Sequence, residues 1–123
     1  MVTMYKNYVK NYNELNEQIV ELSKNIPEVL SSFASLNKAG IKDGTLDQKT
    51  KELVALGIAI ALRCDGCIAY HAHDSVKAGA TEKEVAEIVG VSVMMGGGPA
   101  VVYGAEALGA VRQFVAEEIK EHG

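Results

Sequence analysis

Several features that would point to particular protein classes are scarce or absent in this sequence. Only two of the 123 residues are proline, so long segments carry no strong helix breaker. The net charge is −4 and no cluster of lysine and arginine stands out, which argues against a surface built for nucleic acid. The longest apolar run, residues 53–62, is too short to cross a bilayer. We therefore expect neither a nucleic-acid partner nor a membrane partner.

The first residues lack the marks of an export signal. They contain no apolar core segment, no twin arginine and no small-residue cleavage site. We therefore expect a cytoplasmic protein. A reducing compartment disfavours a purely structural disulfide, so the two cysteines, Cys64 and Cys67, become candidates for chemistry.

The composition and the periodicity of the chain are those of a helical protein. Apolar residues make up 48% of the sequence, and good helix formers such as Ala, Leu, Glu and Lys are abundant. No linker, low-complexity tract or clear internal repeat divides the chain, so we expect residues 1–123 to form a single domain. The apolar spacing predicts an all-α fold of about six helices without a strand, at about residues 5–22, 27–40, 45–62, 65–78, 81–95 and 99–119.

Capping residues indicate where two of these helices begin. Thr45 with Gln48, and Thr81 with Glu84, fit the spacing of a capping box. Residues 53–62 are apolar nearly all round, so the helix that carries them is expected to be buried on most sides. A buried strand is the alternative for this run, but helical periodicity leads into it without a turn signal.

The segment from Cys64 to His73 carries the strongest chemical signal. On a helix with Cys64 at zero, Cys67 falls at about 300°, His71 at about 340° and His73 at about 180°. Both thiols and one imidazole therefore share a face. The thiols are expected in the first turn, where free N–H groups and the helix dipole favour thiolate, and His71 can exchange a proton with Cys67. Cys64 can resolve an oxidised Cys67 and is expected to be the more exposed thiol.

Glu52 is a further candidate on the preceding helix. It stands just before the apolar run, which can carry its carboxylate toward the interior. A buried carboxylate without a partner is costly, so a hydrogen bond to an imidazole is a plausible arrangement. A solvated carboxylate near the helix start is the alternative.

Together these residues resemble the pattern of the AhpD-like alkylhydroperoxidase and carboxymuconolactone decarboxylase family. Glu52 precedes Cys64 by twelve positions, Cys64, Cys67 and His71 form CxxCxxxH, and His73 extends the match to CxxCxxxHxH. The similarity covers roughly residues 45–115. The resemblance implies an AhpD-like helical bundle with the CxxC pair at the start of a central helix.

The resemblance also implies a peroxidase or disulfide-exchange chemistry. It assigns the attack on a hydroperoxide to Cys67, the resolving step to Cys64, and a proton relay to Glu52 and His71. A lipoyl-bearing or thioredoxin-like partner would restore the dithiol, and no cofactor is implied beyond the redox-active cysteine pair. Similar single-repeat members form trimers or hexamers, and apolar surface beyond a single stripe also favours a homo-oligomer, with the hexamer expected first.

Other functions stay open at this stage. The chain could be a protein disulfide reductase, or a decarboxylase-type enzyme of the same family. It could also be a zinc-binding module in which Cys64, Cys67 and His71 are joined by Glu52, because His73 faces away from them. We expect His73 to serve in packing or at an interface.

Overall fold

The structure is a computed structural model that describes residues 4–122, and its regular elements over that range are all helices. The prediction of six helices and no strand is confirmed for these residues. None of the described helices is long and apolar enough to span a bilayer. In chain order the helices are α1 (Tyr8–Asn25), α2 (Pro27–Ile41), α3 (Gln48–Ala61), α4 (Asp65–Lys77), α5 (Glu82–Gly96) and α6 (Gly98–His122).

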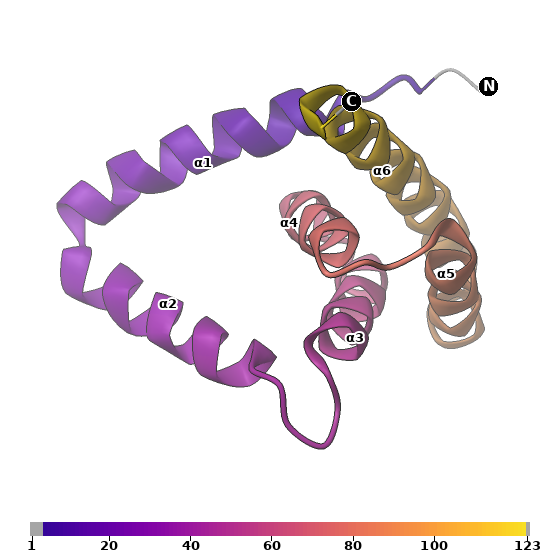
Figure 1. The fold of residues 1–123 in the computed structure, drawn as a ribbon, viewed down its shortest axis with the longest axis horizontal. Coiled ribbons are helices and arrows are strands. Elements are labelled where there is room, and N and C mark those ends of the chain that lie inside the picture. Colours follow the sequence, from indigo (N-terminus) through magenta and orange to yellow (C-terminus); the bar gives the residue numbers. More distant parts are fainter. Residues whose placement is uncertain (1–3, 123) are drawn as a thin grey trace.

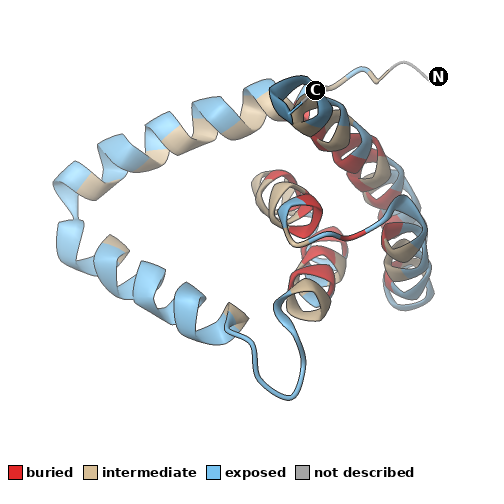
Figure 2. Ribbon diagram, in the orientation of Figure 1, coloured by how far each residue is buried: buried red, intermediate tan, exposed pale blue. Residues whose placement is uncertain are grey.

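The helices α3 to α6 pack together as the body of the molecule, and α1 and α2 frame it from outside (Figure 1). The N-terminal part of α1 packs on α4 and α6, after which α1 and α2 meet at an angle away from the body. Buried residues gather on α3 to α6, and α2 has none (Figure 2). The central helix α4 therefore lies between α1 and α3, with a neighbour on each side.

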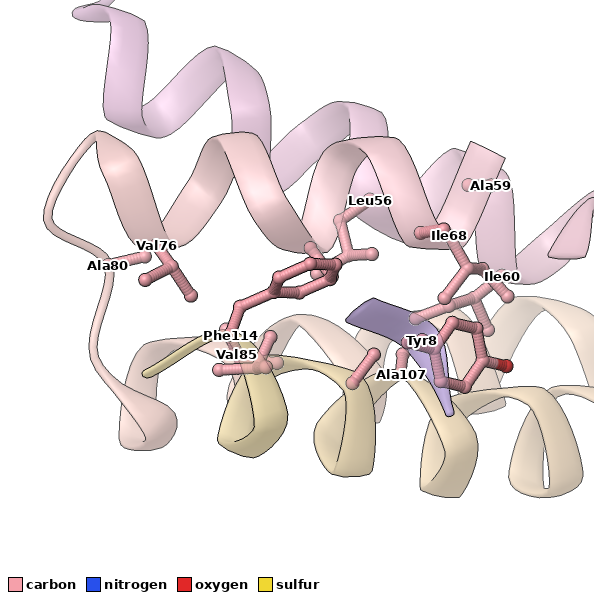
Figure 3. Close-up of a cluster of buried hydrophobic side chains, with 14 of the residues drawn as sticks. Tyr8, Leu56, Ala59, Ile60, Ile68, Val76, Ala80, Val85, Ala107 and Phe114 are labelled. Atoms are coloured by element: carbon pink, nitrogen blue, oxygen red, sulfur yellow. The ribbon is translucent and has the colours of Figure 1, made fainter. Parts of the chain in front are cut away.

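One hydrophobic core joins the four helices of the body (Figure 3). Burial of an aliphatic side chain of this size stabilises the fold by about 1.5–3 kcal/mol. The core therefore fixes the position of α4, the helix that carries the cysteine motif, against α3 and α6. The largest aliphatic side chains with an exposed fraction of 0% are Leu56, Ile60, Ile68, Val85 and Val111.

The helix α3 is buried on one side only. Leu56 and Ile60 lie in the core, but Val54, Ile58 and Leu62 are about half exposed or more. The expectation that this helix is buried on most sides is wrong for the single chain, because α4, α5 and α6 pack on one side of α3 and leave these three side chains exposed.

The two expected capping boxes have different outcomes. Thr81 and Glu84 form theirs at the start of α5, with both reciprocal hydrogen bonds present. The box expected from Thr45 is wrong, because Asp47 caps α3 and its carboxylate accepts the Thr50 N–H at 2.8 Å. The hydrogen bonds with Thr50 also hold the pKa of Asp47 below its usual value. A carboxylate is a strong acceptor for the free N–H groups of a helix start, which favours Asp47 as the cap.

The close approach of α5 and α6 leads to a prediction about stability. A Cβ at Gly104 would lie 2.5 Å from Cγ1 of Val89, a short and stiff side chain. We expect Gly104→Ala to lower the free energy of unfolding by about 1–3 kcal/mol through overpacking. Gly90→Ala is the matched control, because Gly90 lies exposed in α5 with nothing within 4 Å of an added Cβ. It should raise the free energy of unfolding by about 0.5–1 kcal/mol in urea titrations, and equal effects of the two substitutions would contradict this packing.

Candidate active site

The chain turns sharply between α3 and α4, next to the cysteines. Arg63 has a φ of 58°, the left-handed conformation that costs a side-chain-bearing residue about 1–2 kcal/mol. The turn is held by backbone hydrogen bonds from the Arg63 N–H to the Ile60 carbonyl and from the Cys64 N–H to the Ala59 carbonyl, both 3.1 Å. A strained conformation that its surroundings hold in place is typical of a functional turn.

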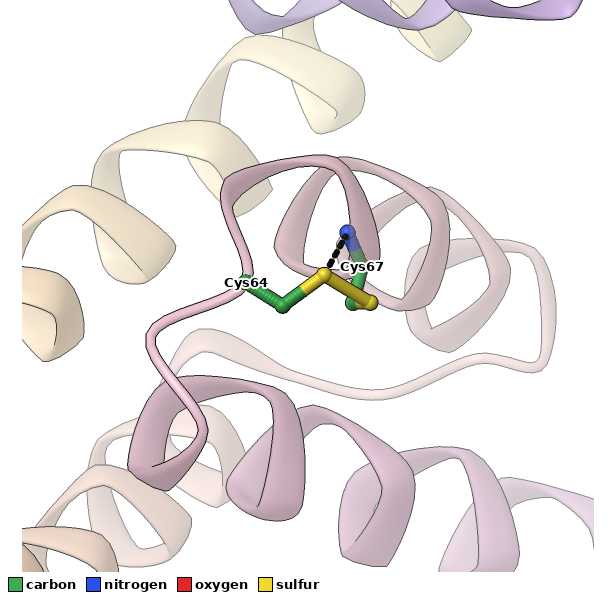
Figure 4. The surroundings of a disulfide bond; sticks show 2 residues. All are labelled: Cys64 and Cys67. Carbon is green, nitrogen blue, oxygen red and sulfur yellow. Dashed lines mark hydrogen bonds between the residues drawn. A yellow bond between two sulfur atoms is a disulfide. The ribbon is translucent and has the colours of Figure 1, made fainter.

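Cys64 and Cys67 are joined by a disulfide at the start of α4 (Figure 4), with their Cα atoms 5.1 Å apart. Cys64 is the N-cap residue, and its Sγ accepts the backbone N–H of Cys67 at 3.2 Å. The expectation that both cysteines lie inside the first turn is therefore correct only for Cys67. A sulfur that accepts a helix N-terminal N–H is in the environment that favours thiolate once the disulfide is reduced.

The two cysteines share a half-buried environment, so a clear difference in exposure between them is not seen. Cys67 packs against the hydrophobic core, on the helix that also carries His71. Figure 4 shows the pair on the side of the first turn of α4 that is directed toward α3. The pair therefore lies on the face of α4 opposite α1.

Glu52 and His71 meet between α3 and α4. The Oε1 atom of Glu52 lies 2.9 Å from Nδ1 of His71, and Glu52 is buried with an exposed fraction of 4%. The structure thus brings together the two residues for which the sequence suggested a hydrogen bond. When Glu52 is ionised it accepts the Nδ1–H proton, which leaves Nε2 of His71 as the basic nitrogen. His71 lies four residues after Cys67, which places the two side chains on the same face of α4.

His73 and Tyr70 face α1 instead. The imidazole of His73 stacks on Tyr12 with ring centroids 4.2 Å apart, and its Nδ1 lies 2.9 Å from Oδ1 of Asp74. The hydroxyl of Tyr70 donates to the Asn16 side chain, and burial raises the pKa of Tyr70 above its usual value. These contacts agree with the packing role expected for His73.

Sequence reasoning missed Asp74 as a neighbour of Glu52 and His71. Glu52, His71 and Asp74 each bring a ligand atom to within 4.8 Å of the other two, a grouping that could hold a cation. The spacing of three residues between His71 and Asp74 on a helix was the available signal. The hydrogen bond between Glu52 and His71 already gives each of these two side chains a polar partner.

The zinc site considered from the sequence needs both cysteines as thiolates. In the disulfide neither sulfur can serve as a thiolate ligand, so that site does not exist in this oxidised form. Sequence reasoning also made no use of Asp65, which stands between the cysteines and binds two side chains from the N-terminal segment.

Comparison with known proteins gives a consistent family match. Residues 27–110 match the model of the carboxymuconolactone decarboxylase family. The chain is 35% identical over 95 residues to an uncharacterized protein of Cupriavidus necator, covering 77% of this chain and 84% of that protein.

Two solved structures of carboxymuconolactone decarboxylase family proteins are similar to this chain over most of its length. The family protein lpg0406 of Legionella pneumophila has a TM-score of 0.84 and 43% identity, covering 87% of this chain and 96% of that one. A family protein of Thermotoga maritima has a TM-score of 0.75 and 31% identity, covering 96% of this chain and 97% of that one. The description of the Thermotoga protein names a possible involvement in antioxidative response.

Proposed function

Since this chain belongs to the carboxymuconolactone decarboxylase family, we propose that it is a thiol-dependent oxidoreductase that reduces hydroperoxides. One observation carries the proposal. A Cys64–Cys67 disulfide stands at the N-terminus of α4, and His71, one turn beyond Cys67 on the same helix, is hydrogen-bonded to the buried Glu52 of α3. A redox pair beside a proton carrier is the arrangement that peroxide reduction needs.

The oxidative half-reaction uses both cysteines. The Cys67 thiolate attacks one oxygen of the hydroperoxide, the O–O bond breaks, and Cys67 becomes a sulfenic acid. His71 holds the proton from the Cys67 thiol and returns it to the departing alkoxide, so that an alcohol leaves. The Cys64 thiolate then attacks the Cys67 sulfur, which forms the disulfide and releases the hydroxyl group as water once it takes up the Cys64 proton.

The reductive half-reaction needs a dithiol from outside the chain. We propose a lipoyl-bearing or thioredoxin-like partner in a cytoplasmic setting, where such dithiols are kept reduced. One partner thiolate attacks the sulfur of Cys64, the N-cap residue that stands just before the first turn of α4. The partner's second thiol resolves the mixed disulfide, so the partner becomes oxidised and both cysteines return as thiols.

Peroxide consumption with two reductants side by side tests this proposal. We expect consumption of an alkyl hydroperoxide when a lipoyl domain or thioredoxin, each with its reductase, is present. Reduction of a model protein disulfide without any peroxide consumption would instead establish a disulfide reductase. Turnover of a lactone substrate by a Cys64→Ser/Cys67→Ser double variant would support the decarboxylase alternative and contradict the proposal.

We also propose that copies of the chain associate as a trimer or hexamer. The helix α2 has no buried residue, and Val29, Phe33 and Leu36 on it are each more than 60% exposed. Apolar surface on this scale is typical of a contact surface. Light scattering should report a mass of three or six chains, and a monomeric mass at micromolar concentration would contradict the assembly.

A further inference from the structure

A second polar cluster lies on the side of the cysteine turn away from Glu52 and His71. Oδ1 of Asp65 accepts the Tyr8 hydroxyl at 2.7 Å and the Lys6 ammonium at 3.2 Å. The same ammonium donates to Oε1 of Glu106 at 3.0 Å, and the Tyr5 hydroxyl donates to the other oxygen of Glu106. The cluster thus joins the N-terminal segment, α4 and α6 at the cysteine motif.

The position of Asp65 allows its charge to influence the ionisation of the cysteine thiols. Asp65 directly follows Cys64 and is the first residue of α4, so its carboxylate competes with the thiolates for the same helix dipole. It precedes Cys67 by two residues, which places the two side chains about 200° apart around the helix. A carboxylate with no compensating positive charge opposes the ionisation of a thiol in the same helix turn.

The helix α1 packs closely against the cysteine turn, next to the Asp65 carboxylate. Tyr8 is fully buried, with an exposed fraction of 0%, although it stands at the start of a mostly exposed helix. Farther along α1, Cδ2 of Leu15 lies 3.0 Å from where a Cβ on Gly66 would stand. The N-terminal segment is therefore packed against the residues between the cysteines, Asp65 and Gly66.

We propose that Lys6 and Tyr8 are positioning residues that hold the Asp65 carboxylate on the α1 side of the turn and neutralise its charge there, so that the cysteine pair keeps a reactive thiolate. The inference rests on the proposed thiol chemistry, and it extends that chemistry to a group of residues outside the CxxCxxxH motif. Glu106, buried on α6, fixes Lys6 from the other side.

The protonation states of the two donors suit this role. Burial lowers the pKa of Lys6, but its hydrogen bonds with Glu106 and Asp65 outweigh that effect, and the net pKa is raised. Burial, together with the hydrogen bond to Asp65, raises the pKa of Tyr8 well above its usual value. Lys6 thus stays a cation and Tyr8 a neutral donor over the range in which thiols titrate.

The test is the pKa of the more reactive thiol in the reduced protein, read from the pH dependence of its alkylation by iodoacetamide. We expect Lys6→Met to raise this pKa by about half a unit, because the charge of Asp65 is then less compensated. Asp65→Asn should lower it by a similar amount. In the Asp65→Asn background, Lys6→Met should have less than half of its effect. Lys10→Met is the matched control, since Lys10 is an exposed lysine of α1 whose ion pair among the described residues is with Glu14.

Two results would overturn the proposal. One is a thiol pKa in Lys6→Met that equals that of Lys10→Met. The other is an undiminished effect of Lys6→Met in the Asp65→Asn background, which would mean that Lys6 acts without Asp65. If Lys6→Met does not fold, Tyr8→Phe replaces it in the same comparison. Tyr103→Phe is its control, because Tyr103 is a partly buried tyrosine of α6 that packs against the core. The alkylation readout needs no peroxide turnover, so this inference and the proposed function can fail separately.

Discussion

Replacing Cys67 with serine should remove peroxide reduction almost entirely, with a loss of about 10³-fold or more. The nucleophile in the proposed reaction is the Cys67 thiolate, and a serine hydroxyl at the same place does not ionise near neutral pH. Cys67 packs against the core one turn before His71, whereas Cys64 stands outside the helix as its N-cap. Consumption of a hydroperoxide, followed with saturating reductant, measures the effect.

Cys64→Ser is the matched variant for this experiment. It should consume one equivalent of peroxide and then stop, leaving a Cys67 sulfenic acid that dimedone traps. The reverse pattern, with a trapped sulfenic acid on Cys64 in the Cys67→Ser variant, would exchange the two roles. Full turnover in either variant would contradict a dithiol cycle.

The second large effect is expected at His71. Removing a general base or acid lowers rates by about 10²–10⁴-fold, so His71→Ala should lower kcat/KM within that range. Glu52→Gln should have a smaller effect, because an amide oxygen can still accept the Nδ1–H proton while the negative charge is lost. Steady-state kinetics separates the two variants by the size of the loss, since only His71→Ala removes the imidazole that is proposed to carry the proton.

His73→Ala provides the control for His71→Ala. Both histidines lie on α4, but the His73 ring stacks on Tyr12 and its Nδ1 pairs with Asp74, whereas Nδ1 of His71 pairs with Glu52. Its removal should leave kcat/KM within a few-fold of the unaltered protein, with thermal unfolding used to check that both variants fold. Equal losses for the two substitutions would contradict the assignment of the relay to His71.

Much of the helical architecture could be predicted because local signals determine it. Apolar periodicity located all six helices, and the Thr81–Glu84 capping box was readable from spacing alone. The start of α3 could not be predicted in this way. Asp47 and Thr45 are both residues that favour a helix N-cap, and only the backbone conformation shows that Asp47 takes this position. The one-sided burial of α3 depends on which helices reach it, which is a tertiary fact that the periodicity of one segment does not contain.

The candidate site likewise has features that the sequence predicts and features that only the structure reveals. The shared face of Cys67 and His71 follows from helical pitch, and Glu52 was suggested by the cost of burying a carboxylate. The contacts of Asp65 could not be predicted in this way. They come from Lys6 and Tyr8, more than fifty residues earlier in the chain, and depend on how α1 packs across α4.

The central claim is that Cys64 and Cys67 alternate between dithiol and disulfide when they meet a hydroperoxide. The direct measurement adds alkyl hydroperoxide stepwise to the reduced protein and records free thiols together with the mass of the peptide that carries both cysteines. The account predicts that one equivalent of peroxide removes both thiols and lowers the mass of that peptide by about two hydrogens. Two thiols that stay free with excess peroxide, in protein that remains folded, would contradict it.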